Sequence, residues 1–541
     1  MTAPMTGGQA VVAALVAHGV DTVFGIPGTH NLEIYRHLAG SGIRHVSPRH
    51  EQGAGYAADG YARTCGRPGV AVVTSGPALL NAAAAVGQAW SDSVPVLVVS
   101  PGLPLRHPGL GNGLLHEARD QGAAMAALAA ASIRVTSVGE IPVAVAQAFA
   151  LMTGGRPRPV HLEIPLDVLL ESGNAAPVRL PDRTPAPADA AAVTAAAARL
   201  SAAARPVLLV GGGARGAAAS VRRIAEHLGA PTVTTANGKG VLPETHPLSL
   251  GAGLHLPAVR DLVADADVVL AVGTELAPSD LWNGPLPLAD QLVRIDVDPV
   301  GCLANATPAV ALVGDAGATL DALLDSLPEA TGGPGAERAA SWRARKQQEA
   351  RVEGAEWLPI VEQLAAALPV DAILAGDSAM VCYYGALTNL ATSRPGSFLY
   401  PTGFGTLGYG LPAAVGAKVA APDAPVVAVL GDGGIMFTLA ELATAADLGL
   451  PLPVLVVDNS GYGEIRNEMI DRDDPVHAVT FRSPDFAAIG RAVGCHGVTL
   501  DGPAGLADAV RSALSADRPT VLHLRHDPAA TTTPDPRGAS R

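Results

Sequence analysis

A strand–turn–helix–strand pattern between residues 426 and 459 limits the possible folds of this chain more than any other feature. The apolar runs at its two ends have the length of buried strands. The tetrad 431–434, GDGG, predicts a turn, and Thr438 and Glu441 have the spacing of a capping box that opens a helix. Two strands joined through one helix are parallel, with a right-handed connection. The pattern therefore predicts an open α/β sheet.

Two polar side chains end the predicted strands. Asp432 and Asn459 stand 27 residues apart, each at a carboxyl end, where open α/β sheets bind ligands. A carboxylate, an amide and a nearby backbone carbonyl are hard oxygen donors that suit Mg²⁺, whose other ligands are usually water and phosphate. The backbone N–H groups of Gly433 and Gly434 could approach a diphosphate at the helix start. A plain turn is the alternative, because Gly-Asp-Gly is common in turns.

Length and composition exclude several other classes. The 541 residues, 48% hydrophobic and 16% charged, predict a globular chain of three or four domains. A formal charge of −14 without a basic stripe argues against a nucleic-acid partner. The four distant cysteines show neither metal spacing nor a disulfide framework, which fits a reducing cytoplasm. We expect no signal peptide, and no membrane span in the uncharged run 69–90, because residues 74–77 (TSGP) interrupt it.

Composition also divides the chain. Segments 171–190 and 327–341 are rich in proline, alanine, glycine and polar residues and indicate linkers. In each of the three segments that the linkers leave, apolar strands alternate with alanine-rich helices, the pattern of doubly wound parallel sheets. The predicted domains are 1–172, 190–327 and 350–527, followed by a disordered tail, 528–541. In the middle domain the glycine run 211–213 indicates a structural Rossmann-like domain, with a nucleotide-phosphate loop as the alternative.

Six further motifs occur in an order that covers nearly the whole chain. They are FGIPG (24–28), RHEQGAGYAADGYAR (49–63), TSGPALLN (74–81), RPVHLEIPLDV (158–168), RIDVDP (294–299) and GTLGYGLPAA (405–414). Together with the GDGG…DN unit, they resemble the thiamine-diphosphate-dependent enzymes of the acetohydroxyacid synthase and 2-oxo-acid decarboxylase type. The resemblance implies a pyrimidine-binding domain and a diphosphate-binding domain that flank the Rossmann-like domain.

The resemblance assigns roles around thiamine diphosphate. Glu51 would hydrogen-bond the aminopyrimidine ring, although a helix-start glutamate is the alternative. Leu407 would hold the two rings of the cofactor folded, where a simple core leucine is the alternative, and Gly405 would offer its carbonyl. Asp432, Asn459 and the Gly461 carbonyl would bind Mg²⁺. The other residues implied at the cofactor are Ser378, Gly431, Gly433, Gly434, Tyr462 and Gly463.

The same resemblance implies which residues transfer protons and whether the central domain binds a flavin. His30 and His116 would move protons near neutral pH, and Thr29 takes a position near the reacting carbon. Each lone histidine is otherwise structural. The segments 251–257 and 271–284 depart from the flavin-contacting stretches of the synthases, so bound FAD is not expected.

The segment after Gly461 bears on the substrate. Where the synthases carry a tryptophan for acceptor choice, this chain has Glu468, and Glu464 lies one helical turn earlier. These acids would suit a cationic substrate side chain, although a solvated helix face is the alternative. The segments YPTGFGTLGYG (400–410), GDGGIMFT (431–438) and DNSGYGEIR (458–466), together with LLHEARDQ (114–121), resemble the 5-guanidino-2-oxopentanoate decarboxylase branch. This resemblance implies decarboxylation of a 2-oxo acid to an aldehyde.

Two alternatives stay open. One is an acetolactate-synthase-like carboligase, which joins the decarboxylated 2-oxo acid to a second carbonyl. The other is a non-catalytic relative that only binds cofactor. In the family, the regions that contain Glu51 and Asp432 meet across a subunit interface, so the resemblance implies a homodimer at least, and a homotetramer of two dimers.

Overall fold

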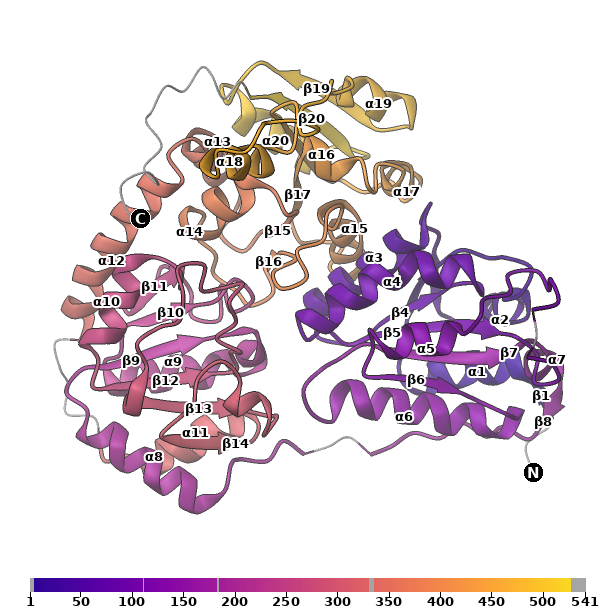
Figure 1. The fold of residues 1–541 in the computed structure, drawn as a ribbon, viewed down its shortest axis with the longest axis horizontal. Helices are drawn as coiled ribbons and strands as arrows, with labels where there is room; N and C mark the ends of the chain where they lie inside the picture. Colours follow the sequence, from indigo (N-terminus) through magenta and orange to yellow (C-terminus); the bar gives the residue numbers. More distant parts are fainter. Residues whose placement is uncertain (1–3, 110, 182–183, 330–334, 527–541) are drawn as a thin grey trace. The chain divides into compact units, whose positions relative to one another are not determined.

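The computed structural model describes residues 4–109, 111–181, 184–329 and 335–526. Its residues pack as two compact units (Figure 1). Unit 1 consists of Met1–Arg183, Phe404–Asp423 and Thr438–Leu450, and unit 2 of Thr184–Gly403, Ala424–Phe437 and Pro451–Arg541. The predicted disordered tail, 528–541, lies outside the described residues, as do parts of both predicted linkers.

Unit 1 is built on a six-stranded parallel sheet with the order β3-β2-β4-β5-β7-β6. Its strands are β2 (Thr22–Gly25), β3 (Arg44–Val46), β4 (Gly69–Val72), β5 (Val96–Gly102), β6 (Ala131–Arg134) and β7 (Val160–Pro165). Its helices from the N-terminal segment are α1 (Gly7–Ala17), α2 (Leu32–Leu38), α3 (Glu51–Cys65), α4 (Pro77–Ser91), α5 (Gln121–Ala126), α6 (Ile141–Thr153) and α7 (Leu166–Leu170). The two-residue strands β1 (Met5–Thr6) and β8 (Ser172–Gly173) form a separate antiparallel pair.

Both faces of this sheet are buried, because alternate residues of each strand enter different cores. Val70 and Val72 of β4 pack with α1 and α6, whereas Ala71 packs with α3 and α4. Burial on both faces is typical of parallel sheets. It explains why the sequences of these strands are continuous apolar runs.

Two later segments complete unit 1 and supply α15 (Gly410–Ala420) and α17 (Glu441–Asp447). Helix α15 packs closely against α3. A Cβ atom on Gly60 would lie 2.2 Å from the Ala413 carbonyl oxygen, and one on Gly416 would lie 1.9 Å from the Ala57 carbonyl oxygen. These two glycines therefore allow the helix backbones to touch.

The first sheet of unit 2 is also parallel, with the order β11-β10-β9-β12-β13-β14. Its strands are β9 (Pro206–Val210), β10 (Thr232–Thr234), β11 (Ser249–Ala252), β12 (Val268–Val272), β13 (Leu292–Asp296) and β14 (Val310–Val313). The neighbouring helices are α8 (Ala190–Ala202), α9 (Ala218–Leu228), α10 (Pro257–Asp265), α11 (Ala316–Ser326) and α12 (Gly335–Glu353). Counted along the chain, the order is 3-2-1-4-5-6, that of a dinucleotide-binding Rossmann sheet.

The second sheet of unit 2 has the order β16-β15-β17-β18-β20-β19, with all neighbours parallel. Its strands are β15 (Ile373–Gly376), β16 (Phe398–Leu399), β17 (Val426–Gly431), β18 (Pro453–Asp458), β19 (His496–Leu500) and β20 (Thr520–Arg525). Its helices are α13 (Leu358–Ala367), α14 (Leu387–Asn389), α16 (Asp432–Ile435), α18 (Gly463–Asp471), α19 (Phe486–Ala492) and α20 (Leu506–Leu514). Counted along the chain, this sheet and the sheet of unit 1 share the order 2-1-3-4-6-5.

The predicted fold class is confirmed, since three parallel sheets flanked by helices are present. In both sheets of order 2-1-3-4-6-5 the direction of winding reverses between the first and third strands. Open sheets of this kind bind ligands outside the carboxyl ends of the strands at such a switch point. In unit 1 this point lies between β2 and β4, and in unit 2 between β15 and β17.

The predicted capping box is wrong. Helix α17 begins at Glu441 itself, and the Thr438 hydroxyl donates to the Gly408 carbonyl at 2.8 Å instead of capping the helix. The predicted turn at 431–434 is replaced by the end of β17 and the short helix α16. Among the described residues, no helix combines the length and the apolar character that crossing a membrane requires.

Candidate active site

Asp432 and Asn459 meet at the carboxyl end of the second sheet of unit 2, as their positions after β17 and β18 predict. One terminal atom of the Asn459 amide lies 3.2 Å from Oδ1 of Asp432 and 2.8 Å from the Gly461 carbonyl oxygen. With its nitrogen in that position, the amide donates two hydrogen bonds. With its oxygen there, three oxygen atoms converge on one point. The three predicted metal-binding groups are therefore neighbours.

These groups fit a hard divalent cation. A carboxylate, an amide oxygen and a backbone carbonyl are oxygen donors of the type that Mg²⁺ prefers. Rotation of the Asn459 amide would exchange its hydrogen bonds for coordination without any backbone movement. Within the described ranges, no group of three or more His, Cys, Asp or Glu side chains is arranged to hold a metal. A cation at Asp432 would thus depend on the amide and the carbonyl.

The Asp432 carboxylate is held in a buried polar network. Its Oδ2 accepts from the Gly461 N–H at 3.0 Å and from the Ser483 hydroxyl at 2.9 Å, and Ser483 Oγ lies 2.7 Å from Oδ1 of Asp458. Burial, with the nearby charge of Asp458, raises the pKa of Asp432 to about 6. Burial raises the pKa of Asp458, but the hydrogen bond from His523 outweighs this effect, so the pKa of Asp458 is lowered to about 2. A cation would offset the cost of ionising Asp432.

Three glycines beside this carboxylate leave no room for a side chain. A Cβ atom on Gly433 would lie 2.7 Å from the Tyr462 ring, and one on Gly434 would lie 2.8 Å from Oδ2 of Asp377. On Gly463, it would lie 2.6 Å from the Asn459 amide. Gly431 has only Ala379 nearby, at 3.6 Å, which is ordinary contact. The backbone of Gly433 and Gly434 is therefore fixed by packing at the start of α16.

Ser378 lies at the same switch point. It follows the last residue of β15 by two positions, it is half-buried, and its backbone N–H donates to the Asp377 carboxylate at 2.8 Å. Asp377 in turn contacts the backbone at Gly434. The structure therefore places Ser378 near the GDGG segment, and its contact with a diphosphate stays a prediction.

The two glutamates of α18 have different surroundings. Glu464, half-buried in the first turn, accepts a hydrogen bond from the Tyr384 hydroxyl at 2.7 Å. Burial raises the pKa of Tyr383, and the Glu464 carboxylate raises it further. Glu468 is exposed. Only Glu464 is therefore held in a defined position.

Glu51, in unit 1, is the first residue of α3, as the helix-start reading predicts. Its Oε2 accepts from the Asn81 amide of α4 at 2.9 Å. Its charge also adds to burial in raising the pKa of the Tyr35 hydroxyl. The His50 ring caps the start of α3, where its Nδ1 accepts a hydrogen bond from the Gln52 N–H at 3.1 Å. The Glu51 carboxylate is therefore oriented by its neighbours.

Glu441 holds the chain just before Glu51, which sequence reasoning did not detect. Its buried carboxylate accepts from the backbone N–H of Arg49 at 3.1 Å and of His50 at 3.0 Å. The Thr444 hydroxyl donates to it at 2.6 Å. A Cβ atom on Gly53 would lie 2.3 Å from Oε1 of Glu441. The glycine in the motif RHEQG thus makes room for a carboxylate that fixes the start of α3.

The predicted pair His30 and His116 is brought together at the switch point of unit 1. Their ring centroids lie 4.9 Å apart in an edge-to-face arrangement, and Nδ1 of His30 lies 2.6 Å from the Ser75 hydroxyl. Burial, then the neighbouring His116, lowers the pKa of His30. Thr29 precedes His30 in the same turn and is exposed. His30 is therefore mainly neutral at pH 7 and oriented by Ser75, another residue that was not predicted.

The segment that contains Gly405 and Leu407 belongs to unit 1. Gly405 has a φ of +63°, a conformation that favours glycine, and Leu407 is half-buried. Between them, Thr406 Oγ1 lies 2.5 Å from the Tyr56 hydroxyl of α3. The half-buried position of Leu407 leaves part of its side chain free to contact a ligand.

The glycine run of the central sheet has a structural explanation. A Cβ atom on Gly211 would lie 2.3 Å from the Gly273 carbonyl oxygen, and one on Gly213 would lie 2.9 Å from the Gly273 Cα. These glycines allow the turns after β9 and β12 to touch. Their presence therefore does not require a bound nucleotide.

The sheets, the oxygen donors at Asp432 and the oriented glutamate at the start of α3 define a thiamine-diphosphate enzyme. Family models agree over three regions: the thiamine pyrophosphate enzyme N-terminal binding domain over residues 5–124, the central domain over 193–323 and the C-terminal binding domain over 379–524. The chain belongs to the thiamine pyrophosphate enzyme family, and the resemblance seen in its motifs is confirmed.

Individual relatives cover almost the full length. A protein named probable 2-ketoarginine decarboxylase AruI, from Pseudomonas aeruginosa, is 45% identical over 529 residues, which are 96% of this chain and 94% of that protein. Acetolactate synthase isozyme 2 large subunit from Escherichia coli is 34% identical over 99% of this chain and 98% of its own. Acetolactate synthase large subunit IlvB1 from Mycobacterium tuberculosis is 34% identical over 96% and 87%. The chain is thus an enzyme that depends on thiamine diphosphate.

Proposed function

We propose that this enzyme decarboxylates 5-guanidino-2-oxopentanoate, a 2-oxo acid with a guanidinium side chain. The substrate takes up one proton and yields CO₂ and the aldehyde that is one carbon shorter. The observation that carries this assignment is the Glu464 carboxylate, which is half-buried and fixed by Tyr384 directly after the metal-binding loop. The 45% identity to a protein named as a 2-ketoarginine decarboxylase supports the same substrate.

The chemistry of Glu464 suits a guanidinium group. A planar guanidinium donates two parallel N–H bonds to a carboxylate, and such charge-assisted bonds are about twice as strong as neutral ones. The Tyr384 hydroxyl donates one hydrogen bond to Oε1 of Glu464, which restrains the rotamer of this side chain. Glu468, the second predicted acid, is exposed and screened by water, so we assign it the smaller part.

We expect the predicted contacts to hold the cofactor. Asp432, Asn459 and the Gly461 carbonyl would bind Mg²⁺, and the N–H groups of Gly433 and Gly434 would bind phosphate oxygens, with Ser378 beside them. The other predicted contacts are Glu51 at the aminopyrimidine ring, Gly405 and Leu407 at the ring junction, and Gly431, Tyr462 and Gly463 near the diphosphate. Thiamine diphosphate, when bound, would supply the electron sink that accepts the electron pair released with CO₂.

The two histidines would transfer protons to and from the substrate. His30 is mainly neutral at pH 7 and held by Ser75, so its ring can accept or return a proton without a change of orientation. His116 lies against it edge-to-face. Thr29, exposed in the same turn, would border the substrate. The pair therefore suits the protonation that completes the aldehyde.

A substrate comparison tests the proposal. Purified enzyme with thiamine diphosphate and Mg²⁺ should release CO₂ from 5-guanidino-2-oxopentanoate, and much less from 2-oxohexanoate, which lacks the cation. Glu464→Gln should lower kcat/KM for the guanidino acid by about 10- to 100-fold, because one charge-assisted pair is lost. The matched control, Glu468→Gln, should stay within about threefold, as expected for an exposed charge. Equal losses in both variants, or no CO₂ from the guanidino acid, would contradict the assignment.

A carboligase is the second candidate, because the acetolactate synthases above match this chain at 34% identity over nearly its full length. Such an enzyme would join the decarboxylated 2-oxo acid to a second carbonyl. Glu468 stands where the resemblance places a tryptophan in the synthases, which disfavours this activity. Colorimetric detection of acetolactate from pyruvate would support it.

Assembly and location follow from the resemblance and the composition. We expect a homodimer at least, and a homotetramer of two dimers, in the cytoplasm. None of the four cysteines, all of them in the described part of the chain, forms a disulfide, in keeping with a reducing compartment. Light scattering coupled to size exclusion measures the subunit number.

A further inference from the structure

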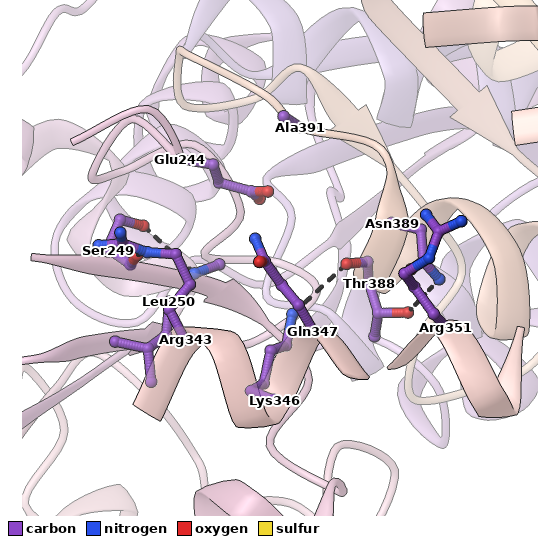
Figure 2. A pocket seen from close by; sticks show the side chains of 11 residues that line it. Glu244, Ser249, Leu250, Arg343, Lys346, Gln347, Arg351, Thr388, Asn389 and Ala391 are labelled. Carbon is purple, nitrogen blue, oxygen red and sulfur yellow. Dashed lines mark hydrogen bonds between the residues drawn. The ribbon is translucent and has the colours of Figure 1, made fainter. Parts of the chain in front are cut away.

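A polar cavity in unit 2 has no part in the proposed chemistry. Its volume is about 290 Å³, several times the roughly 30 Å³ that one water occupies in the liquid. It lies between β11, at the edge of the central sheet, helix α12, and α14 with the residues just after it (Figure 2). The lining residues that carry the argument are Glu244, Ser249, Arg343, Lys346, Arg351 and Thr388.

The charge that faces the cavity is positive. Arg343, Lys346 and Arg351 come from successive turns of α12. The only carboxylate in the lining, Glu244, is already paired with Lys239, whose Nζ lies 2.5 Å from its Oε1. With Glu244 counted in full, the lining carries three cations and one anion, a surplus of two positive charges. A ligand with two negative charges would balance it.

Lys346 makes the inner end of the cavity suitable for an anion. Its side chain is 2% exposed, and its stem packs beside Gly253 and Thr388. Its ammonium group donates to the Thr388 carbonyl at 3.4 Å, a long bond for a group with three donors. Figure 2 shows the amine rising from α12 toward the space between β11 and Thr388. A buried cation with so little compensation is costly unless an anion joins it.

The two arginines complete the site at different depths. The Arg343 guanidinium donates to the backbone carbonyls of Ser249, at 2.6 Å, and of Pro247, and its pKa is lowered by burial. It therefore approaches the cavity without a carboxylate partner. Arg351 is exposed at the outer end and pairs with Glu362 at 3.0 Å, a contact that water screens. Gln347, also exposed, adds an amide between them.

We infer that this cavity is a binding site for a small dianion, either a phosphate group or a dicarboxylate, that bridges α12, β11 and the Thr388 segment. The ligand would accept hydrogen bonds from Lys346 and Arg343 inside and from Arg351 at the mouth. Because these elements belong to both sheets of unit 2, occupancy would stabilise the unit against unfolding. The site is separate from Asp432 and serves as a candidate regulatory site.

The groups around Lys346 set its pH response. Burial lowers its pKa to about 8, the charge of Lys239 adds to this, and Glu244 and Glu353 oppose it. An anion would favour the protonated amine. Binding should therefore take up a fraction of a proton above pH 7.5 and weaken as the pH rises beyond 8, with Arg343 and Arg351 charged throughout.

Calorimetry on the holoenzyme tests the inference. Protein saturated with thiamine diphosphate and Mg²⁺, so that its diphosphate site is filled, is titrated with inorganic phosphate, with succinate, or with chloride at equal ionic strength. Saturable binding of phosphate, succinate or both supports the site and identifies the chemistry. Binding of neither, or equal binding of chloride, overturns it.

Variants assign the binding to this cavity. Lys346→Met should weaken binding at least about tenfold, through loss of a charge-assisted bond, and Arg351→Gln should weaken it less. The matched control is Arg345→Gln, on the same helix, which pairs with Asp261 and Glu349 outside the cavity. It should bind as the parent does. Unchanged affinity in both Lys346→Met and Arg351→Gln overturns the assignment, whatever the binding elsewhere.

Discussion

Replacing Lys346 by methionine should make the ligand-free protein more stable. The side chain is 2% exposed, and its pKa falls from an ordinary value of 10.5 to about 8. One pKa unit corresponds to about 1.4 kcal/mol, so the protonated amine costs the folded state about 3 kcal/mol at pH 7. Methionine keeps the length of the chain without the charge.

The expected gain is smaller than this cost. The variant loses the long hydrogen bond to Thr388 and leaves Glu244 with one cation fewer nearby. Such losses offset about 1 kcal/mol, so the net gain is about 2 kcal/mol. For a chain of this size that corresponds to a rise of roughly 2 °C in the unfolding midpoint.

The pH dependence separates this reasoning from a general packing effect. Because the folded-state pKa of Lys346 is depressed, the unfolded state binds more protons between pH 8 and 10.5. The stability of the parent therefore rises relative to the variant in this window, and most of the roughly 2 kcal/mol difference should be gone by pH 9.5.

Urea denaturation at pH 7 and pH 9.5, in buffer free of phosphate and dicarboxylates, measures the difference. The buffer matters because a bound dianion would stabilise the parent alone. Gln347→Met, one residue further along α12 and exposed, is the control and should be neutral. A Lys346→Met protein that is less stable than the parent, or a difference that is constant with pH, would refute the argument.

Three other expectations concern unit 1. Glu51→Gln should lower kcat by at least about 100-fold while calorimetry still detects cofactor binding, since an amide keeps the size but not the charge; retention of full activity would argue against its role. Gly53→Ala should lower the unfolding midpoint by several degrees, because its methyl would lie 2.3 Å from the Glu441 carboxylate, and the same substitution made in a Glu441→Ala background, where that carboxylate is gone, should cost less than it does in the parent. Burial lowers the pKa of His161 to about 3, so the free energy of unfolding should fall as the pH drops from 6.5 toward 3, by up to about 4 kcal/mol, and His161→Gln should lose most of this dependence in acid-denaturation curves.

Much of the fold could be predicted because the burial of a strand determines which of its residues are apolar. Strands covered on both faces are continuous apolar runs, and β17 and β18 are found within a residue or two of their predicted ends. The order of the strands could not be predicted, since it depends on contacts between segments far apart. The same holds for the assignment of residues 404–423 and 438–450 to unit 1.

The predicted site shows the same limit. The sequence indicates Asp432 and Asn459 because the carboxyl ends of parallel strands meet at one edge. Thr438 and Glu441 satisfy the local capping-box rule, yet Glu441 binds the N–H groups before Glu51, about 390 residues away. Ser483 lies 51 residues from Asp432 in sequence, also beyond the reach of a local motif. No local pattern marks such partners.

The shared strand order of the first sheet of unit 1 and the second sheet of unit 2 has a consequence for ancestry. Two domains with identical winding, separated by a Rossmann domain of different winding, are what duplication of one ancestral gene segment would leave. Each copy inherits a crevice where its winding reverses, and each crevice has since acquired its own polar residues: the histidine pair in one copy, the carboxylate and amide in the other. The first and last sheets of the chain would then descend from duplicated copies carried in a single polypeptide.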